Sequence, residues 1–252
     1  MITGLILLAI VAGIAAFSYR QSRLEQRLIK DVALIDWINL FILPILGYLV
    51  CVFLTANILS RPGVRFVRIN DFILVSVGIL FLVYAYVGNS IHFVSKVLYR
   101  HMKITNPVFR INELFHGKLS HYVTTVCIFL TLFVLALLEL NHPLQKGFQN
   151  VPFLIDALAG IVMGISVSRI IFYTVELRDN KSMLLFCFAM FIALISLLIG
   201  FSLPISSYPI TASLVVSMGT FIILFCLRRI IIRFRWTKKR SLRLLTKIML
   251  LG

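Results

Sequence analysis

Three histidines and one glutamate in the middle of the chain are of residue types that could do chemistry. His92 closes an apolar run that ends in Gly-Asn-Ser-Ile-His, and Glu113, His116, Ser120 and His121 precede the next apolar run. If this second segment is a helix that continues into that run, its four residues lie along one side, at positions i, i+3, i+7 and i+8. His92 then reaches a similar depth on the neighbouring helix.

Imidazole and carboxylate groups are ligands that zinc and other divalent metals take, with one coordination position left for water. The metal lowers the pKa of this water and makes it a nucleophile. The sequence therefore predicts His92, His116 and His121 as metal ligands and Glu113 and Ser120 as catalytic residues. The predicted function is a membrane-embedded, metal-dependent hydrolase or lipid-modifying enzyme, and the predicted cofactor is a divalent metal such as zinc.

Seven long apolar stretches must position these residues. The 252-residue chain is 60% hydrophobic and only 13% charged, which is more apolar surface than one globular core can bury. Unbroken runs of about 20 apolar residues predict membrane-spanning helices rather than barrel strands. The predicted fold is an all-α polytopic bundle of about seven transmembrane helices, over residues 2–17, 32–57, 72–94, 122–140, 151–173, 183–203 and 208–227.

The positive charges predict the orientation of this bundle. If the N-terminus lies outside, 20 of the 25 Lys and Arg residues lie on the cytoplasmic side; the exceptions are Arg61, Arg65, Arg68, Lys146 and the intramembrane Arg169. The positive-inside rule therefore predicts an N-out, C-in protein, placed in the cell membrane with a cytoplasmic C-terminus. The loop from Arg61 to Arg68 is interpreted as an ordinary solvated loop on the outer side.

The largest basic block follows the last span. Two parts are predicted, a transmembrane domain over residues 1–227 and a basic tail over residues 228–252. In the tail, Lys239, Arg240, Arg243 and Lys247 share one helical face and apolar residues share the other, which is typical of a helix lying at the membrane surface. The predicted partners are the bilayer and its anionic headgroups, and the net charge of +16 is not read as nucleic-acid binding.

The fifth predicted span carries two charged residues and a row of small ones. Asp156 lies near its outer end and Arg169 nearer its inner end, and Gly160, Gly164 and Ser168 follow Asp156 at four-residue steps. Small residues at this spacing predict a face against which another helix packs closely. Asp156 and Arg169 lie roughly 20 Å apart at a 1.5 Å rise per residue, so each requires a different partner; for Arg169 a lipid phosphate is one candidate.

Two other classes of function stay open. Spans two to four and five to seven form triplets of opposite orientation, and Pro44 with Gly47 interrupts the first helix of one triplet as Gly160 with Gly164 interrupts that of the other. Paired interruptions of this kind indicate an inverted-repeat transporter of small solutes or lipids. The other class of function is that of a non-catalytic membrane subunit.

Overall fold

The protein is described here by a computed structural model that covers residues 1–18, 22–64, 66–103, 105–144, 150–173 and 181–233. These residues form an almost entirely helical structure with a single two-stranded hairpin, whose strands β1 (Leu28–Ile29) and β2 (Val32–Ala33) are antiparallel. The larger helices are α1 (Ile2–Ser18), α4 (Leu43–Leu59), α5 (Asp71–His101), α7 (Ser120–Asn141), α8 (Asn150–Tyr173), α9 (Lys181–Gly200) and α10 (Pro209–Arg233). Shorter helical elements are α2 (Ser22–Gln26), α3 (Leu34–Trp37), η1 (Ile38–Ile42), α6 (Val108–Glu113), η2 (Leu114–Leu119) and η4 (Ile205–Ser207).

Among the described residues, six helices are long and apolar enough to cross a membrane. The six are Leu34–Leu59, Asp71–His101, Val108–Asn141, Phe153–Phe172, Ser182–Gly200 and Pro209–Ile230. The first of the seven predicted spans forms the shorter apolar helix Ile2–Phe17, which does not reach that length. The predicted all-helical class is therefore confirmed, and the six helices are compatible with an integral membrane protein, whereas the count of seven spans stays a prediction.

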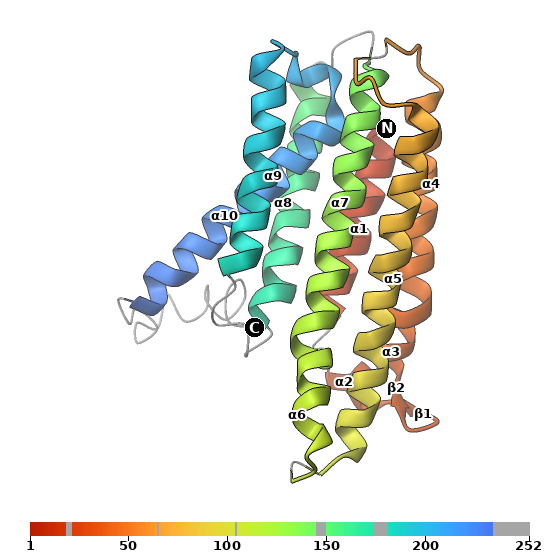
Figure 1. The fold of residues 1–252 in the computed structure, drawn as a ribbon, viewed down its shortest axis with the longest axis vertical. Helices are drawn as coiled ribbons and strands as arrows, with labels where there is room; N and C mark the ends of the chain where they lie inside the picture. Colours follow the sequence, from red (N-terminus) through yellow and green to blue (C-terminus); the bar gives the residue numbers. More distant parts are fainter. Residues whose placement is uncertain (19–21, 65, 104, 145–149, 174–180, 234–252) are drawn as a thin grey trace.

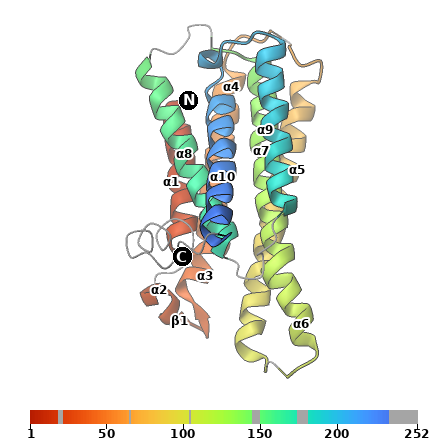
Figure 2. The same cartoon turned by 90° about the vertical axis from the view of Figure 1, so that its left-hand side faces the viewer.

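Two groups of helices make up the bundle. Figures 1 and 2 show α1, α4, α5 and α7 side by side, with α8, α9 and α10 along the other side of α1 and α7. α5 and the continuous run of α6, η2 and α7 extend beyond the other helices at the lower end of Figure 1. We call this the histidine end, because it carries His92, and the other end the opposite end. α10 continues through the predicted boundary at residues 227 and 228, and the predicted surface helix of the tail lies outside the described residues.

The small-residue face of α8 packs against α10, as the sequence predicts. A Cβ atom added at Gly160 would lie 2.5 Å from the backbone oxygen of Ser213, and one added at Gly164 would lie 2.5 Å from that of Ser217. Real Cβ atoms essentially never approach a backbone oxygen so closely. The two backbones are therefore in direct contact, and both glycines are required for that contact.

The orientation of the bundle stays a prediction, and fusions to the full-length protein test it. We expect a reporter placed after Gly252 to be cytoplasmic and one inserted between Pro143 and Asn150 to lie on the other side, because this orientation puts 20 of the 25 Lys and Arg residues in cytoplasmic segments of the sequence. Alkaline phosphatase and green fluorescent protein activities of each fusion make the measurement. Both reporters on one side of the membrane would contradict the span assignment.

Candidate functional site

Three imidazole rings meet at the histidine end. His92 comes from α5, His116 from η2 and His121 from α7. The ring centroid of His92 lies 4.5 Å from that of His116 and 4.6 Å from that of His121. His92 is only 7% exposed. The predicted run of one helix from Glu113 into the fourth span is confirmed, since α6, η2 and α7 follow one another without a break.

A close contact between α5 and α7 brings these rings together. A Cβ atom at Gly88 would lie 2.6 Å from Oγ1 of Thr124 and 3.0 Å from the backbone oxygen of Ser120. His92 follows Gly88 by one helical turn, and His121 is next to Ser120 in the chain. Glycine at position 88 thus sets the separation at which the two histidines meet.

Two π-helical segments pack against α5 at this level. η2 carries His116, and η1 lies against α5 where the side-chain amide of Asn89 donates a 2.6 Å hydrogen bond to the backbone oxygen of Asn39. A π-helical turn widens the backbone and leaves carbonyl groups less well satisfied, and such turns are frequent at functional sites. Asn89 satisfies one carbonyl of η1, and the hydroxyl of Ser120 donates a 2.7 Å hydrogen bond to the backbone oxygen of His116 in η2.

The three rings are stacked and tilted in the structure. The planes of His92 and His116 are within 19° of parallel, whereas His121 is inclined to His92 by 57°. In the part of the chain that the structure describes, no group of three or more His, Cys, Asp or Glu side chains is arranged to hold a metal ion. The nitrogen Nδ1 of His116 is buried and has no hydrogen-bond partner among these residues. The predicted ligands therefore lie together, but the predicted metal geometry is not formed by the rings as they stand.

The two predicted catalytic residues have different surroundings. Ser120 is fully buried and its hydroxyl is engaged with the backbone of His116, so it positions that histidine rather than facing a substrate. Glu113 ends α6 and is partly exposed. A partly exposed carboxylate is able to act as a general base.

An ion-pair cluster lies beside the histidines on α5. The buried carboxylate of Asp36 accepts a 2.6 Å hydrogen bond from Nζ of Lys96, and Nη2 of Arg100 lies 3.5 Å from its other oxygen. Lys96 also lies 3.7 Å from Glu25 on α2. The cluster holds α2 and α3 against α5, because a buried carboxylate is stable only with partners of opposite charge.

The two charged residues of α8 lie at different ends. Asp156 is only 1% exposed, and its Oδ1 has no hydrogen-bond partner among the described residues. Arg169 lies at the histidine end, where its Nε donates a 3.2 Å hydrogen bond to the backbone oxygen of Ala16. Its guanidinium carbon lies 4.6 Å from the ring centroid of Phe17. Arg169 thus contacts α1, which is not one of the partners that the sequence suggests for it.

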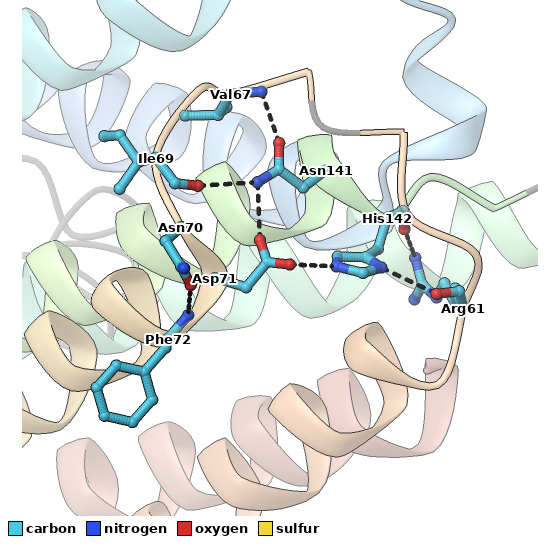
Figure 3. Close-up of polar contacts among 8 residues, drawn as sticks. All are labelled: Arg61, Val67, Ile69, Asn70, Asp71, Phe72, Asn141 and His142. Atoms are coloured by element: carbon cyan, nitrogen blue, oxygen red, sulfur yellow. Dashed lines mark hydrogen bonds and ion pairs between the residues drawn. The ribbon is translucent and has the colours of Figure 1, made fainter.

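A second polar network, which the sequence does not predict, closes the opposite end (Figure 3). Nε2 of His142 lies 3.0 Å from the carboxylate of Asp71, and its Nδ1 lies 2.9 Å from the backbone oxygen of Arg61. Arg61 donates in return to the backbone oxygen of His142, and Asn141 donates a 2.8 Å hydrogen bond to Asp71. The network joins the end of α7 to the start of α5 and to the loop before it.

Glu139 extends this network to α10. Its carboxylate is fully buried and accepts hydrogen bonds of 3.1 Å from the backbone N–H of Ile210 and 3.0 Å from that of Thr211. These are the second and third residues of α10, whose N–H groups have no partner within the helix. Nη1 of Arg61 lies 3.7 Å from the same carboxylate. A glutamate of α7 therefore caps α10 and neutralises a buried arginine.

Glu139 affects the pKa values of two ionisable groups beside it. Burial lowers the pKa of the Arg61 guanidinium, and the charge of Glu139 opposes this effect. Burial raises the pKa of the Tyr208 phenol, and the same charge raises it further. In both groups burial is the larger cause of the shift and the carboxylate of Glu139 the smaller one.

Arg61 itself departs from the prediction of a solvated loop, although most of the described residues from Pro62 to Arg68 are exposed. Its side chain is 9% exposed, because Glu139 and the backbone of His142 surround the guanidinium. Two sequence signals could have pointed to this network. Glu139, Asn141 and His142 end an otherwise apolar helix, and the loop that contains Arg61 is basic on the side where the charge rule predicts few basic residues.

Comparison with protein families, curated proteins and solved structures found no match to this chain.

Proposed function

We propose that this integral membrane protein is a metal-dependent hydrolase that acts on lipid ester or amide bonds at the histidine end. The observation that supports the proposal is the approach of His116 from η2 and His121 from α7 to the ring of His92 on α5, together with the buried Nδ1 of His116, which has no hydrogen-bond partner among the described residues. A buried polar atom without a partner is costly, and an ion is one of the few things that explain it. The predicted orientation puts this site at the cytoplasmic leaflet.

The chemistry assigned to the site is hydrolysis by activated water. A zinc ion held by His92, His116 and His121 would supply a water molecule of lowered pKa for this hydrolysis. That water would cleave the ester or amide bond, and a proton would pass to the alcohol or amine that leaves. Glu113 is the residue that can take the proton of the water, and Ser120 positions His116.

Metal binding requires the rings to turn. His92 and His116 are stacked within 19° of parallel, and this arrangement must open so that one nitrogen of each faces a common point. The backbone need not move, since rotation about the side-chain torsions of His92 and His121 reorients their rings. The proposal thus includes a change of side-chain conformation on binding.

The test is the metal content of the purified full-length protein after dialysis against Zn²⁺. We expect about one metal per chain in the wild type and a loss of well over tenfold in affinity for His92→Ala and His121→Ala, because even changes in the outer shell of a site typically cost 10–100-fold. His101→Ala is the matched control. It removes an exposed histidine from the same helix and should leave the metal in place. Wild-type protein that takes up no metal would rule out the hydrolase.

A transporter is the second candidate, and the buried Asp156 favours it. Ionisable residues inside membrane helices often mark ion or proton pathways, and Oδ1 of Asp156 has no partner among the described residues. The packing of the two triplets argues against an inverted repeat, however. The third helix of the first triplet, α7, packs mainly against α5, whereas the third helix of the second, α10, packs mainly against α8. These are not corresponding pairs, so the hydrolase is preferred.

A further inference from the structure

An apolar groove of about 590 Å³ runs between α1 and α8. Both helices lie at the side of the bundle in Figure 2, where α8 crosses α1. The lining residues of each helix recur every three to four positions, so they lie on one face of that helix. The lining residues are Ile6, Ala9, Ile10, Gly13, Ile14 and Phe17 of α1 and Ile155, Leu158, Ala159 and Val162 of α8.

The size of the groove fits one hydrocarbon chain. The lining of α1 extends over twelve residues from Ile6 to Phe17, and their eleven steps of 1.5 Å span about 16 Å. One leaflet of the hydrocarbon core is about 15 Å thick. The volume also lies within the range of roughly 300–1,000 Å³ that is usual for ligand pockets. In a bilayer such a groove faces lipid tails, since its walls are wholly apolar side chains.

The end of the groove at Phe17 is positively charged. The guanidinium of Arg169 lies over the ring of Phe17, and its Nε bonds to the backbone of Ala16. This contact holds the arginine where α8 approaches the end of α1. In the sequence Arg20 and Arg23 follow Phe17 within six residues. Arginine matches the geometry of phosphate oxygens, and Arg169 lies four residues before the end of α8 at Tyr173.

We propose that the groove binds one acyl chain of an anionic phospholipid, and that Arg169 contacts the phosphate of that lipid. The apolar walls select a hydrocarbon chain, and the positive end selects a negative headgroup over a zwitterionic one. The site is separate from the proposed hydrolase, because none of the lining residues belongs to the histidine cluster.

Filling the groove tests the proposal. A Cβ atom at Gly13 would meet only Cγ1 of Val162 at 4.0 Å, so Gly13→Leu places its side chain in the groove without displacing the backbone. Gly47→Leu is the matched control. It adds the same side chain to α4, where nothing lies within 4 Å of the added Cβ. Val162→Phe fills the groove from the other wall and carries the same test if Gly13→Leu does not fold.

The measurement is bound lipid per protein after purification from nanodiscs of equimolar phosphatidylglycerol and phosphatidylcholine, by native mass spectrometry. We expect about one phosphatidylglycerol on the wild type and on Gly47→Leu, and at least a tenfold loss of affinity in Gly13→Leu. Equal retention by the wild type and by both groove-filling variants would overturn the proposal. So would an equal loss in Gly13→Leu and Gly47→Leu, or a change of oligomeric state in Gly13→Leu without loss of lipid, because a second copy would then be the occupant.

The headgroup contact has its own test. Arg169→Gln should lower the preference for phosphatidylglycerol over phosphatidylcholine about tenfold, the factor that one charge-assisted hydrogen bond confers. Arg169→Lys keeps the charge and should retain most of the preference. An unchanged ratio of the two lipids in Arg169→Gln would overturn the assignment of Arg169 to the phosphate.

Discussion

Replacing Glu139 with alanine should lower the free energy of unfolding by about 3–5 kcal/mol, which is the usual cost of removing one partner of a buried ion pair. The substitution leaves the guanidinium of Arg61 buried without its carboxylate. It also leaves the backbone N–H groups of Ile210 and Thr211 without an acceptor at the start of α10. Each loss is costly, because water does not reach a residue that is 0% exposed.

The measurement is unfolding of the full-length protein in mixed micelles as the fraction of denaturing detergent rises. Glu139→Gln keeps an oxygen for the N–H groups of α10 but loses the charge opposite Arg61. Its free energy of unfolding should therefore lie between those of the wild type and Glu139→Ala.

Glu25→Ala is the matched control for charge. Glu25 lies 3.7 Å from Lys96, the same distance that separates Glu139 from Arg61, but its side chain is 45% exposed. Solvent screens such a pair, so we expect Glu25→Ala to lower the free energy of unfolding by no more than about 1 kcal/mol. Equal losses in Glu139→Ala and Glu25→Ala would show that burial of the Glu139 pair has no energetic consequence.

The helices themselves were predictable from sequence. Apolar runs of about 20 residues leave the backbone no other way to satisfy its hydrogen bonds in a membrane, and each of the seven predicted stretches is mostly helical in the structure. The second of them begins in β2, at Val32 and Ala33, and the sixth runs past the end of α9 at Gly200. The meeting of His92 with His116 and His121 was also predicted, because residues on one side of a continuous helix face the same neighbour. The orientation of the rings was not predictable, since it depends on the π-helical turn at His116 and on the contact at Gly88.

The network at the opposite end could not be assembled from local sequence. Glu139 and the residues that it caps are about 70 positions apart, and Arg61 comes from a third segment. Sequence periodicity shows which side of a helix is polar but not which helix terminus lies opposite. The acidic residue at the end of the fourth span therefore reads as a boundary residue until the position of α10 is known.

The structure confirms the predicted close helix contact on the small-residue face of α8 and adds the identity of the partner. The four-residue spacing of Gly160 and Gly164 predicts a close helix contact but does not identify the partner. The structure identifies it as α10, and the partner residues Ser213 and Ser217 have the same four-residue spacing. Small residues on both helices allow the backbones to touch.

Because of that contact, we expect a glycine-to-alanine substitution in α8 to destabilise the protein, the reverse of its usual effect in a helix. Glycine to alanine inside a helix ordinarily stabilises it by up to about 1 kcal/mol. Gly164→Ala should instead destabilise the protein by about 1–3 kcal/mol, because the new methyl group would lie 2.5 Å from the backbone oxygen of Ser217 and 2.7 Å from Cβ of Thr220. Neither atom can move without displacing α10.

The double variant Gly160→Ala, Gly164→Ala should lose more free energy of unfolding than either single variant. A methyl group at Gly160 would meet the backbone of Ser213, one turn away on the same interface. Gly47→Ala is the control, because it lies inside α4 with nothing within 4 Å of the added methyl group, and it should be neutral or slightly stabilising. Unfolding in mixed micelles again makes the measurement. If Gly164→Ala behaves as Gly47→Ala does, then α8 and α10 do not approach each other at this distance, and the pairing of the two helices has to be reassigned.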